Sequence, residues 1–297
     1  MASSAARTEP VPHESSLSAL RYPAFRLYFA GQLVSVSGTW MQAIAQQVII
    51  YDLTKSELAL GLVACAQGLP ALIFTPFAGV IVERFPRRGL LVLTQTVLMI
   101  LAFILAWLQF ADKLQVWHIV ALSLGVGIAN ALDAPARQAF VIEMVGKEHL
   151  PSGIVLNAIM FNMARIVGPA LGGLALKTVG PAWCFLLNGV SFLAVIVSLV
   201  IMTVPNPHAL PKDRMLIWQP LKEGFQFSRA HPSIWPLLLL SAVTCTFGLT
   251  FAVLIPSFAD QVLHDTQLGT AALSTAWTVA RRIARLALAQ ALLHPPS

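Results

Sequence analysis

Long stretches without a charged side chain recur along this sequence. No Asp, Glu, Lys or Arg occurs between Arg26 and Asp52, between Glu57 and Glu83, or between Arg88 and Asp112. A helix needs about 20 predominantly apolar residues to cross the hydrocarbon core of a bilayer, and each stretch is long enough. Only 11% of the 297 residues are charged and 57% are hydrophobic, whereas a soluble domain carries about 25% charged residues. The chain is therefore expected to be an integral membrane protein. A soluble enzyme, a disordered chain and a nucleic-acid module are all disfavoured.

The uncharged stretches predict seven membrane-spanning helices, at approximately 27–51, 58–82, 89–110, 115–138, 152–176, 183–204 and 234–258. A membrane β-barrel would instead show alternating strands of about ten residues. The expected division is a tail at 1–24, a six-span half at 25–204, a linker at 205–233 that includes an interfacial helix, and a seventh span within 234–260. The remainder, 261–297, reads as an atypical tail in which 266–280 is a candidate for a marginal eighth span.

The distribution of basic residues predicts the orientation, because Lys and Arg accumulate on the cytoplasmic side of a membrane. With a cytoplasmic N-terminus, the outer loops hold only Lys55, Lys113 and Lys177. The inner segments then hold most of the remaining basic residues, namely Arg7, Arg21, Arg26, Arg84, Arg87, Arg88, Arg137, Lys147, Lys212, Arg214, Lys222 and Arg229. Topology and the anionic lipid of the inner leaflet thus account for the net charge of +6. The lipid bilayer is the expected partner, and nucleic acid is not.

The short inner loop after the second span carries a recognisable motif. Residues 79–88 read GVIVERFPRR, which resembles the signature loop of the major facilitator superfamily, G-x-x-x-D-R-x-G-R-R. The chain departs from it at Glu83, where Asp is usual, and at Pro86, where Gly is usual. Glu83 keeps the negative charge of the usual Asp. It is assigned to gating together with the matching residues Gly79, Arg84, Arg87 and Arg88.

The fifth span carries a second motif of the same superfamily. Residues 164–173 read ARIVGPALGG and resemble the antiporter motif G-x-x-x-G-P-x-x-G-G, with Ala164 in place of its first Gly. Small residues let helix backbones approach closely, and a proline bends a helix. Gly168, Pro169, Gly172 and Gly173 are therefore expected at a close helix contact near a hinge or cavity.

Other stretches resemble a bacterial subfamily that includes the enterobactin exporter and the transmembrane secretion effectors. They lie at 25–28, 31–32, 38–42, 130–140 and 162–166, and the resemblance covers about residues 17–268. It implies an all-α membrane fold of the major facilitator type, with a six-helix N-terminal half and one or two helices of the second half. It also implies an exporter of a small molecule such as a siderophore, drug or metabolite, working by alternating access in the bacterial inner membrane. No cofactor is implied, and a proton is the candidate coupling ion, as in an antiporter.

Two charged residues lie inside expected spans, where charges are costly and usually face a cavity or a partner. Arg165 is either a cavity cation that attracts an anionic substrate or a partner in proton coupling, or else it belongs to an internal ion pair. Asp133 is either a gating acid or one half of a salt bridge to Arg84, Arg88 or, at i+4, Arg137. In the family's pattern an acid at this position helps to hold the loop between the second and third spans, and this structural and gating role is favoured.

Polar amide residues within the spans are further candidates for the substrate cavity, and interhelical hydrogen bonding is an equal alternative for each of them. They are Gln42, Gln46, Asn157 and Asn162. No nucleophile elbow, P-loop or zinc-binding motif occurs in the sequence. The chain is therefore not expected to be an enzyme or to hold a metal.

The end of the chain departs from the family pattern. Near Gly269 the resemblance fades into a composition rich in Thr, Arg, Ala and Leu. A shifted reading frame or a truncated gene is one hypothesis for this change. By family analogy Glu83 would face a helix N-terminus in the opposite half of a complete carrier, where the helix dipole favours a carboxylate. The alternative function is accordingly a transport-inactive remnant or a membrane-embedded interaction partner.

Overall fold

The computed structural model describes residues 17–204, 226–231, 234–237, 239–240, 253–263 and 267–279. Over these residues the secondary structure is helical, and no strand occurs. A short 3₁₀ turn, η1 (Ser18–Arg21), comes before six long helices. These helices are α1 (Pro23–Thr54), α2 (Glu57–Arg84), α3 (Arg87–Phe110), α4 (Val116–Val145), α5 (Leu150–Thr178) and α6 (Pro181–Ile201).

Five of the described helices, α2 to α6, are long and apolar enough to cross a membrane. Helix α1 has 32 residues, which is ample length, but it is interrupted by glutamine, serine, threonine and glycine. Neighbouring helices bury much of α1, including its polar residues Gln32, Ser35 and Gln42. Its polarity therefore reflects a place inside the bundle rather than at the lipid surface. The protein is an all-α, multi-pass membrane protein.

Local sequence signals explain where several helices begin and end. Proline occupies the first turn of α1, α5 and α6, where its missing amide hydrogen costs nothing. Gly146 after α4 and Gly180 before α6 have φ of 75° and 88°, a backbone region that other residues rarely adopt. These glycines allow the tight connections that return the chain into the bundle.

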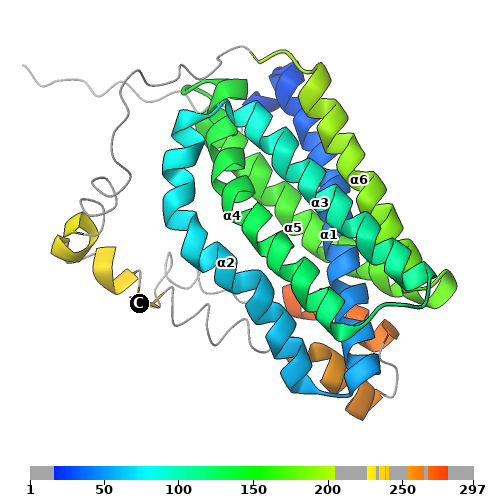
Figure 1. Ribbon diagram of the computed structural model, residues 1–297. Coiled ribbons are helices and arrows are strands. Elements are labelled where there is room, and N and C mark those ends of the chain that lie inside the picture. The colour runs from blue at the N-terminus through cyan, green and yellow to red at the C-terminus, as the bar shows by residue number, and fades with distance from the viewer. Residues whose placement is uncertain are drawn as a thin grey trace, which may run out of the picture.

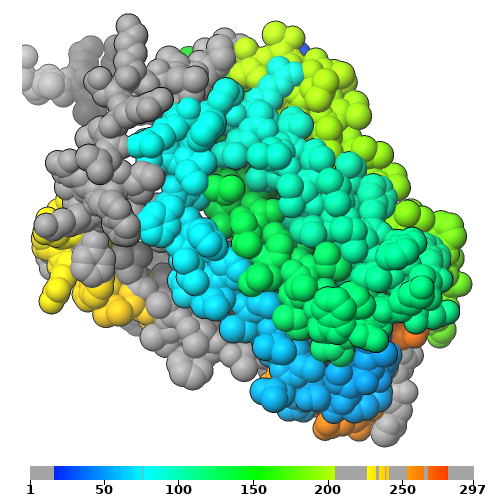
Figure 2. Space-filling view, viewed as in Figure 1, coloured from blue at the N-terminus to red at the C-terminus, as the bar shows by residue number. Residues whose placement is uncertain are grey.

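The helices form one bundle, with long-range pairings between helices that are distant in sequence (Figure 1). Helix α1 packs mainly against α5 and α6, α2 packs against α4, and α3 packs against α4 and α6. Side chains of α2, α3 and α4 together cover one face of the molecule (Figure 2). Leucine, isoleucine and phenylalanine side chains are widely exposed along these helices, for example Leu72, Leu93 and Ile104, as expected for surfaces in contact with lipid.

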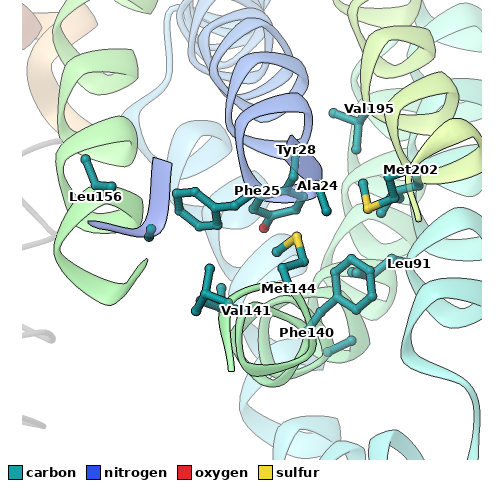
Figure 3. Packing of buried hydrophobic residues seen from close by; sticks show 14 of the residues in the cluster. Ala24, Phe25, Tyr28, Leu91, Phe140, Val141, Met144, Leu156, Val195 and Met202 are labelled. Atoms are coloured by element: carbon teal, nitrogen blue, oxygen red, sulfur yellow. The ribbon is translucent and has the colours of Figure 1, made fainter. Parts of the chain in front are cut away.

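A hydrophobic cluster closes one end of the bundle where α1 begins and α4 ends (Figure 3). Tyr28 and Phe25 of α1 meet Phe140 and Met144 of α4, and all four side chains are at most 1% exposed. The rings of Tyr28 and Phe140 contact edge to face, 6.3 Å apart. The cluster also takes in Val82 of α2, Leu91 of α3, Leu156 of α5 and Leu199 of α6, so all six long helices meet at this end.

Two C-terminal segments pack against the opposite end of the bundle. Residues 253–263 end in a π-helical turn, η2 (Ala259–Leu263), and Ser257 donates a 2.6 Å hydrogen bond to Glu57 at the start of α2. Residues 267–279 form a helix that brings Ala271 against Gly173 of α5. Most of the expected seventh span at 234–258 lies outside the described residues, as do residues 1–16 and most of the expected linker at 205–233. The division of the chain into these segments and the crossing at 266–280 stay predictions.

Candidate functional site

A cavity of about 330 Å³ lies within the bundle and is lined by residues of α1 to α6 and by Val253. Two arginines, Arg137 of α4 and Arg165 of α5, are the charged residues of its described lining. Amide side chains supply most of the other polar groups, from Gln32, Gln42, Gln46, Gln47, Gln67, Gln95, Asn130 and Asn188. The cavity therefore offers cations and hydrogen-bonding groups but no lining carboxylate among the residues described. Its volume falls within the range of about 300–1,000 Å³ usual for small-molecule sites.

Arg165 lies in the cavity wall above the indole of Trp40, with its guanidinium carbon 4.9 Å from the ring centroid. The close approach of α1 and α5 makes this stacking possible. One turn after Arg165, a Cβ on Gly168 would meet the Cβ of Trp40 and would lie 2.7 Å from the carbonyl oxygen of Ser37. The small residue of the antiporter-like motif thus places the aromatic ring beneath the arginine, where a cation–π contact orients it.

Asp133 lies behind the cavity wall and is 0% exposed. Its Oδ1 accepts hydrogen bonds from Thr94 Oγ1 at 2.9 Å and from Gln95 Nε2 at 2.8 Å. Its Oδ2 is paired with Arg137, one helical turn further along α4. Of the partners considered from the sequence, the structure therefore has the i+4 arginine rather than Arg84 or Arg88.

The guanidinium of Arg137 joins this buried acid to the cavity. Its side chain is 12% exposed, its Nη1 lies 3.5 Å from Gln32 Oε1, and its guanidinium carbon is 5.1 Å from the ring centroid of Phe161. Its Nε has no hydrogen-bond partner among the described residues. Arg137, which the sequence suggested for gating only as a partner of Asp133, is thus also a cavity residue.

The amide candidates from the sequence divide into two pairs. Gln42 and Gln46 both line the cavity, and each also forms an interhelical hydrogen bond. Asn188 Nδ2 donates to Gln42 Oε1 at 2.8 Å, and Gln46 Nε2 donates to Ser123 Oγ at 2.8 Å. The two roles considered as alternatives for these residues therefore coexist.

Asn157 and Asn162 of α5 do not belong to the lining of this cavity. Phe161 and Arg165, four residues apart, share the helix face that borders it. Asn162 follows Phe161 directly, so its side chain is turned by about 100° around the helix. Asn157 is partly buried, and its Oδ1 has no hydrogen-bond partner among the described residues.

The motif loop between α2 and α3 is tied to the bundle through the start of α3. Arg87 Nη1 forms an ion pair with Glu143 Oε1 at 3.2 Å and donates to the carbonyl oxygen of Ala139 at 3.2 Å. Arg88 donates to the carbonyl oxygen of Val200 at the end of α6. Glu143, which the sequence reasoning did not single out, thus holds this loop, whereas Asp133 lies deeper in the bundle.

The remaining motif residues lie at or near the C-terminal end of α2. Glu83 and Arg84 are both exposed. A Cβ on Gly79 would meet no heavy atom within 4 Å in the described part of the chain. Gly79 is therefore not at a close helix contact with these residues, and the gating roles of Gly79, Glu83 and Arg84 stay predictions.

The antiporter-like motif in α5 lies along a close contact with α1. Gly168 and Pro169 are buried, as are Gly172 and Gly173. A Cβ on Gly172 would lie 3.2 Å from the carbonyl oxygen of Met41 and 3.5 Å from the Cβ of Ile44. Gly173 instead faces Ala271 of the 267–279 helix. The glycines thus contact two different elements, and two of them form the seam between α1 and α5.

Several residues that line the cavity or support its wall were not predicted from the sequence. In the sequence, Trp40 and Phe161 look like ordinary apolar residues of their spans. Only the packing of the helices brings their rings against the guanidinium groups of Arg165 and Arg137. Thr94 and Gln95 could have been noticed as adjacent polar residues in an otherwise apolar helix. Their role depends on the α3–α4 register, which a single sequence does not reveal.

Comparison with known proteins places this geometry in a family. The family model described as transmembrane secretion effector matches residues 14–279. The enterobactin exporter EntS of Shigella boydii serotype 18 is 26% identical over 246 residues, which cover 82% of this chain and 58% of that protein. EntS of Escherichia coli O1:K1 has the same identity and coverage. The chain thus spans 58% of the length of these curated relatives.

A solved structure supports the fold independently. The inward-facing, unoccupied form of a bacterial homologue of the human lysosomal transporter Spinster matches with a TM-score of 0.60 and 16% sequence identity. The match covers 85% of this chain and 60% of that one. At this identity the likeness shows the fold alone, and the family match over most of the chain supplies the rest. This multi-pass, non-enzymatic membrane protein belongs to the transmembrane secretion effector family of major facilitator transporters.

Proposed function

We propose that this chain forms the substrate-binding N-terminal half of a secondary exporter, and that the substrate is a small molecule with an anionic group. The arginine-lined cavity between the membrane helices carries the proposal. The curated relatives of this chain are enterobactin exporters, which favours export of a siderophore, drug or metabolite. The cavity itself favours a particular chemistry for that molecule.

Two stacked guanidinium groups favour an anion. Arginine presents a planar array of donors that matches a carboxylate or phosphate. The rings of Trp40 and Phe161 stack on one face of the guanidinium groups of Arg165 and Arg137. The two arginine side chains are therefore partly ordered already, and they lose less conformational entropy when a ligand binds. The surrounding amides supply hydrogen bonds to neutral parts of the same molecule. An amphipathic organic anion therefore fits this lining better than a cation or an inorganic ion.

The proposed transport cycle is alternating access, in which one helical half rocks against the other around a midplane site. The contact of Gly168 and Gly172 with α1 provides a closely packed seam that couples movement of α5 to Trp40 in the cavity. At the end of the bundle near Arg87, we propose that Glu83 and Arg84 act in gating by contact with an opposite half. A proton remains the candidate coupling ion.

We further propose that the protein resides in the bacterial inner membrane with its N-terminus in the cytoplasm. The excess of basic residues in the alternate loops supports this orientation. Fusions of alkaline phosphatase and of green fluorescent protein after Thr54 and after Gly146 test it. Phosphatase activity after Thr54 and fluorescence after Gly146 are expected. The reverse pattern would exclude the orientation.

Efflux measurements test the proposed function. Cells or proteoliposomes that contain the protein are loaded with radiolabelled organic anions, and efflux is compared between the unchanged chain, Arg165→Ala and Lys177→Ala. Lys177 is exposed at the end of α5, so its substitution removes the same charge outside the cavity. A hydrogen bond to a charged group contributes about 1.5–3 kcal/mol, so Arg165→Ala should weaken apparent substrate affinity by roughly 10- to 100-fold while Lys177→Ala changes it little. Stable membrane insertion without efflux by the unchanged chain would exclude export by this chain on its own and favour the alternative, a transport-inactive interaction partner.

A further inference from the structure

A second cavity lies at the end of the bundle where α3 begins and α6 ends (Figure 1). Its volume is about 410 Å³, and its described lining consists of residues 86–88 around the start of α3, Glu143 of α4 and residues 202–204 after α6. It shares no described lining residue with the cavity that contains Arg165. The substrate site proposed above therefore does not account for it.

Two arginines lie in the wall of this second cavity, and they differ in how their charge is compensated. Arg87 forms an ion pair with Glu143, 3.2 Å from Nη1 to Oε1. Arg88 donates to the carbonyl oxygen of Val200, and within the described part of the chain no carboxylate forms an ion pair with it. The described lining therefore has a net positive charge, and Arg88 is its source.

The hydrogen bond to Val200 also sets the position of Arg88. Val200 lies in the last turn of α6, where helix carbonyls lack acceptor partners within the helix. A guanidinium has five N–H donors, so one bond to a carbonyl leaves others for a ligand. Thr203 is exposed and lines the same cavity, and its hydroxyl is a further donor. An arginine with a neighbouring hydroxyl suits the oxygens of a phosphate.

The surface around this cavity is apolar. Phe85 before α3 and Ile201 at the end of α6 are both more than half exposed. Leu93 on α3 and Val197 on α6 are exposed as well, and the two helices pack against each other. A ligand with its phosphate at Arg88 would therefore have apolar membrane-helix surface next to it. A phospholipid has both a phosphate and apolar chains, whereas a soluble phosphate has only the first.

We propose that this cavity binds one anionic phospholipid, with its phosphate at Arg88 and Thr203 and its acyl chains along α3 and α6. Basic pockets between membrane helices on the cytoplasmic side are suited to anionic headgroups. The bound lipid bridges the start of α3 and the end of α6, and because it binds the folded chain it stabilises that end of the bundle by mass action. The proposed orientation enters only in the choice of leaflet, which is the inner one.

Native mass spectrometry of the purified chain in detergent tests the site. Phosphatidylglycerol and phosphatidylcholine with identical acyl chains are titrated separately, and their dissociation constants are compared. One phosphatidylglycerol should be retained per chain, about tenfold or more tightly than phosphatidylcholine, because a hydrogen bond to a charged group is lost or screened in the zwitterion. Excess inorganic phosphate and glycerol 3-phosphate supply the same anion in soluble form, and they should not displace the lipid.

Matched variants assign the binding to Arg88. Arg88→Gln should weaken phosphatidylglycerol binding by roughly 10- to 100-fold. Lys147→Gln removes the same charge from an exposed position just after α4, outside the cavity, and should weaken it by no more than about fivefold, as expected for general attraction to anionic lipid. Arg88→Lys should retain part of the affinity, since an ammonium binds phosphate without the planar array of donors.

A variant at Thr203 keeps the test valid if Arg88→Gln does not fold. Thr203→Glu changes an exposed side chain and places a carboxylate beside Arg88, so it should also abolish the preference for phosphatidylglycerol. Equal retention of the two lipids by the unchanged chain would overturn the inference. So would equal losses in Arg88→Gln and Lys147→Gln, displacement by inorganic phosphate, or an unchanged preference in Thr203→Glu. Reversed orientation in the fusion assay would move the site to the other leaflet without altering these binding results, so the two proposals can fail separately.

Discussion

The seam between α1 and α5 predicts a large effect from one added methyl group at Gly168. A Cβ there would lie 2.7 Å from the carbonyl oxygen of Ser37 and 3.3 Å from the amide nitrogen of Met41, and it would also meet the Cβ of Trp40. Real Cβ atoms essentially never lie within 3.0 Å of another heavy atom, so the contact with the Ser37 oxygen alone is too short by at least about 0.3 Å. Two of the crowded atoms belong to backbone that no rotamer change can move.

The helices must consequently separate if Gly168 is replaced by alanine. A gap of about 0.5–1 Å forfeits a quarter to a half of the dispersion energy of each affected contact. Overpacking of this kind costs about 1–3 kcal/mol. Since about 1 kcal/mol shifts the melting temperature by roughly 2–4 °C in domains of 150–250 residues, Gly168→Ala should melt several degrees lower.

Thermal unfolding in detergent, followed by the loss of the monodisperse peak in size-exclusion chromatography, measures this difference. Gly68→Ala is the matched control, because Gly68 is also within a helix but a Cβ there would meet no heavy atom of the described residues within 4 Å. The control should melt at or above the temperature of the unchanged chain, since alanine is the better helix former. Equal melting temperatures for the two variants would refute the close approach of α1 and α5.

Two further predictions concern charged residues at opposite ends of the bundle. Glu143→Ala leaves the mostly buried Arg87 without its carboxylate, and breaking such a pair should lower the stability by about 3–5 kcal/mol. Glu148→Ala, at an exposed site, is the control and should cost little. Similar unfolding midpoints for both variants would contradict the role of the pair. At the other end, the 3.0 Å hydrogen bond from Lys55 to Asp52 raises the pKa of the Lys55 amine, so Lys55 should remain protonated to higher pH and acylate slowly. Mass spectrometry of labelled peptides should show faster labelling of Lys55 in Asp52→Asn at alkaline pH, and an unchanged rate would count against that hydrogen bond.

The all-α membrane fold could be predicted from the sequence because charges are excluded from lipid. The gaps between charged residues in the first 204 positions correspond closely to the helices α1 to α6. Hydropathy alone would have missed α1, which is not among the five sufficiently apolar helices. The absence of charge between Arg26 and Asp52 was therefore the more informative signal, because an interior helix can be polar but carries few charges.

The candidate site was only partly accessible from the sequence. Arg165 could be chosen because a lone cation within a span needs a cavity or a partner. The pairing of Asp133 with Arg137 was one of three open alternatives, because helix periodicity makes the i+4 contact possible but does not show where Arg84 and Arg88 lie. Glu143 was overlooked because it lies beyond the span expected to end at residue 138, whereas α4 continues to Val145. Asn157 and Asn162 were chosen by polarity alone, without knowledge of the helix face.

The interior position of α1 has a consequence for how the chain enters the membrane. A segment with several glutamines, serines and glycines gains little on leaving the translocon for lipid. The helices that cover it most extensively are α5 and α6, and they begin at Leu150 and Pro181, long after α1 has ended at Thr54. During synthesis α1 therefore depends on retention by the insertion machinery, or on temporary contact with other protein segments, until α5 and α6 have been inserted. The residues of α1 that make the finished cavity polar thus also make its insertion into lipid less favourable than that of the five apolar helices.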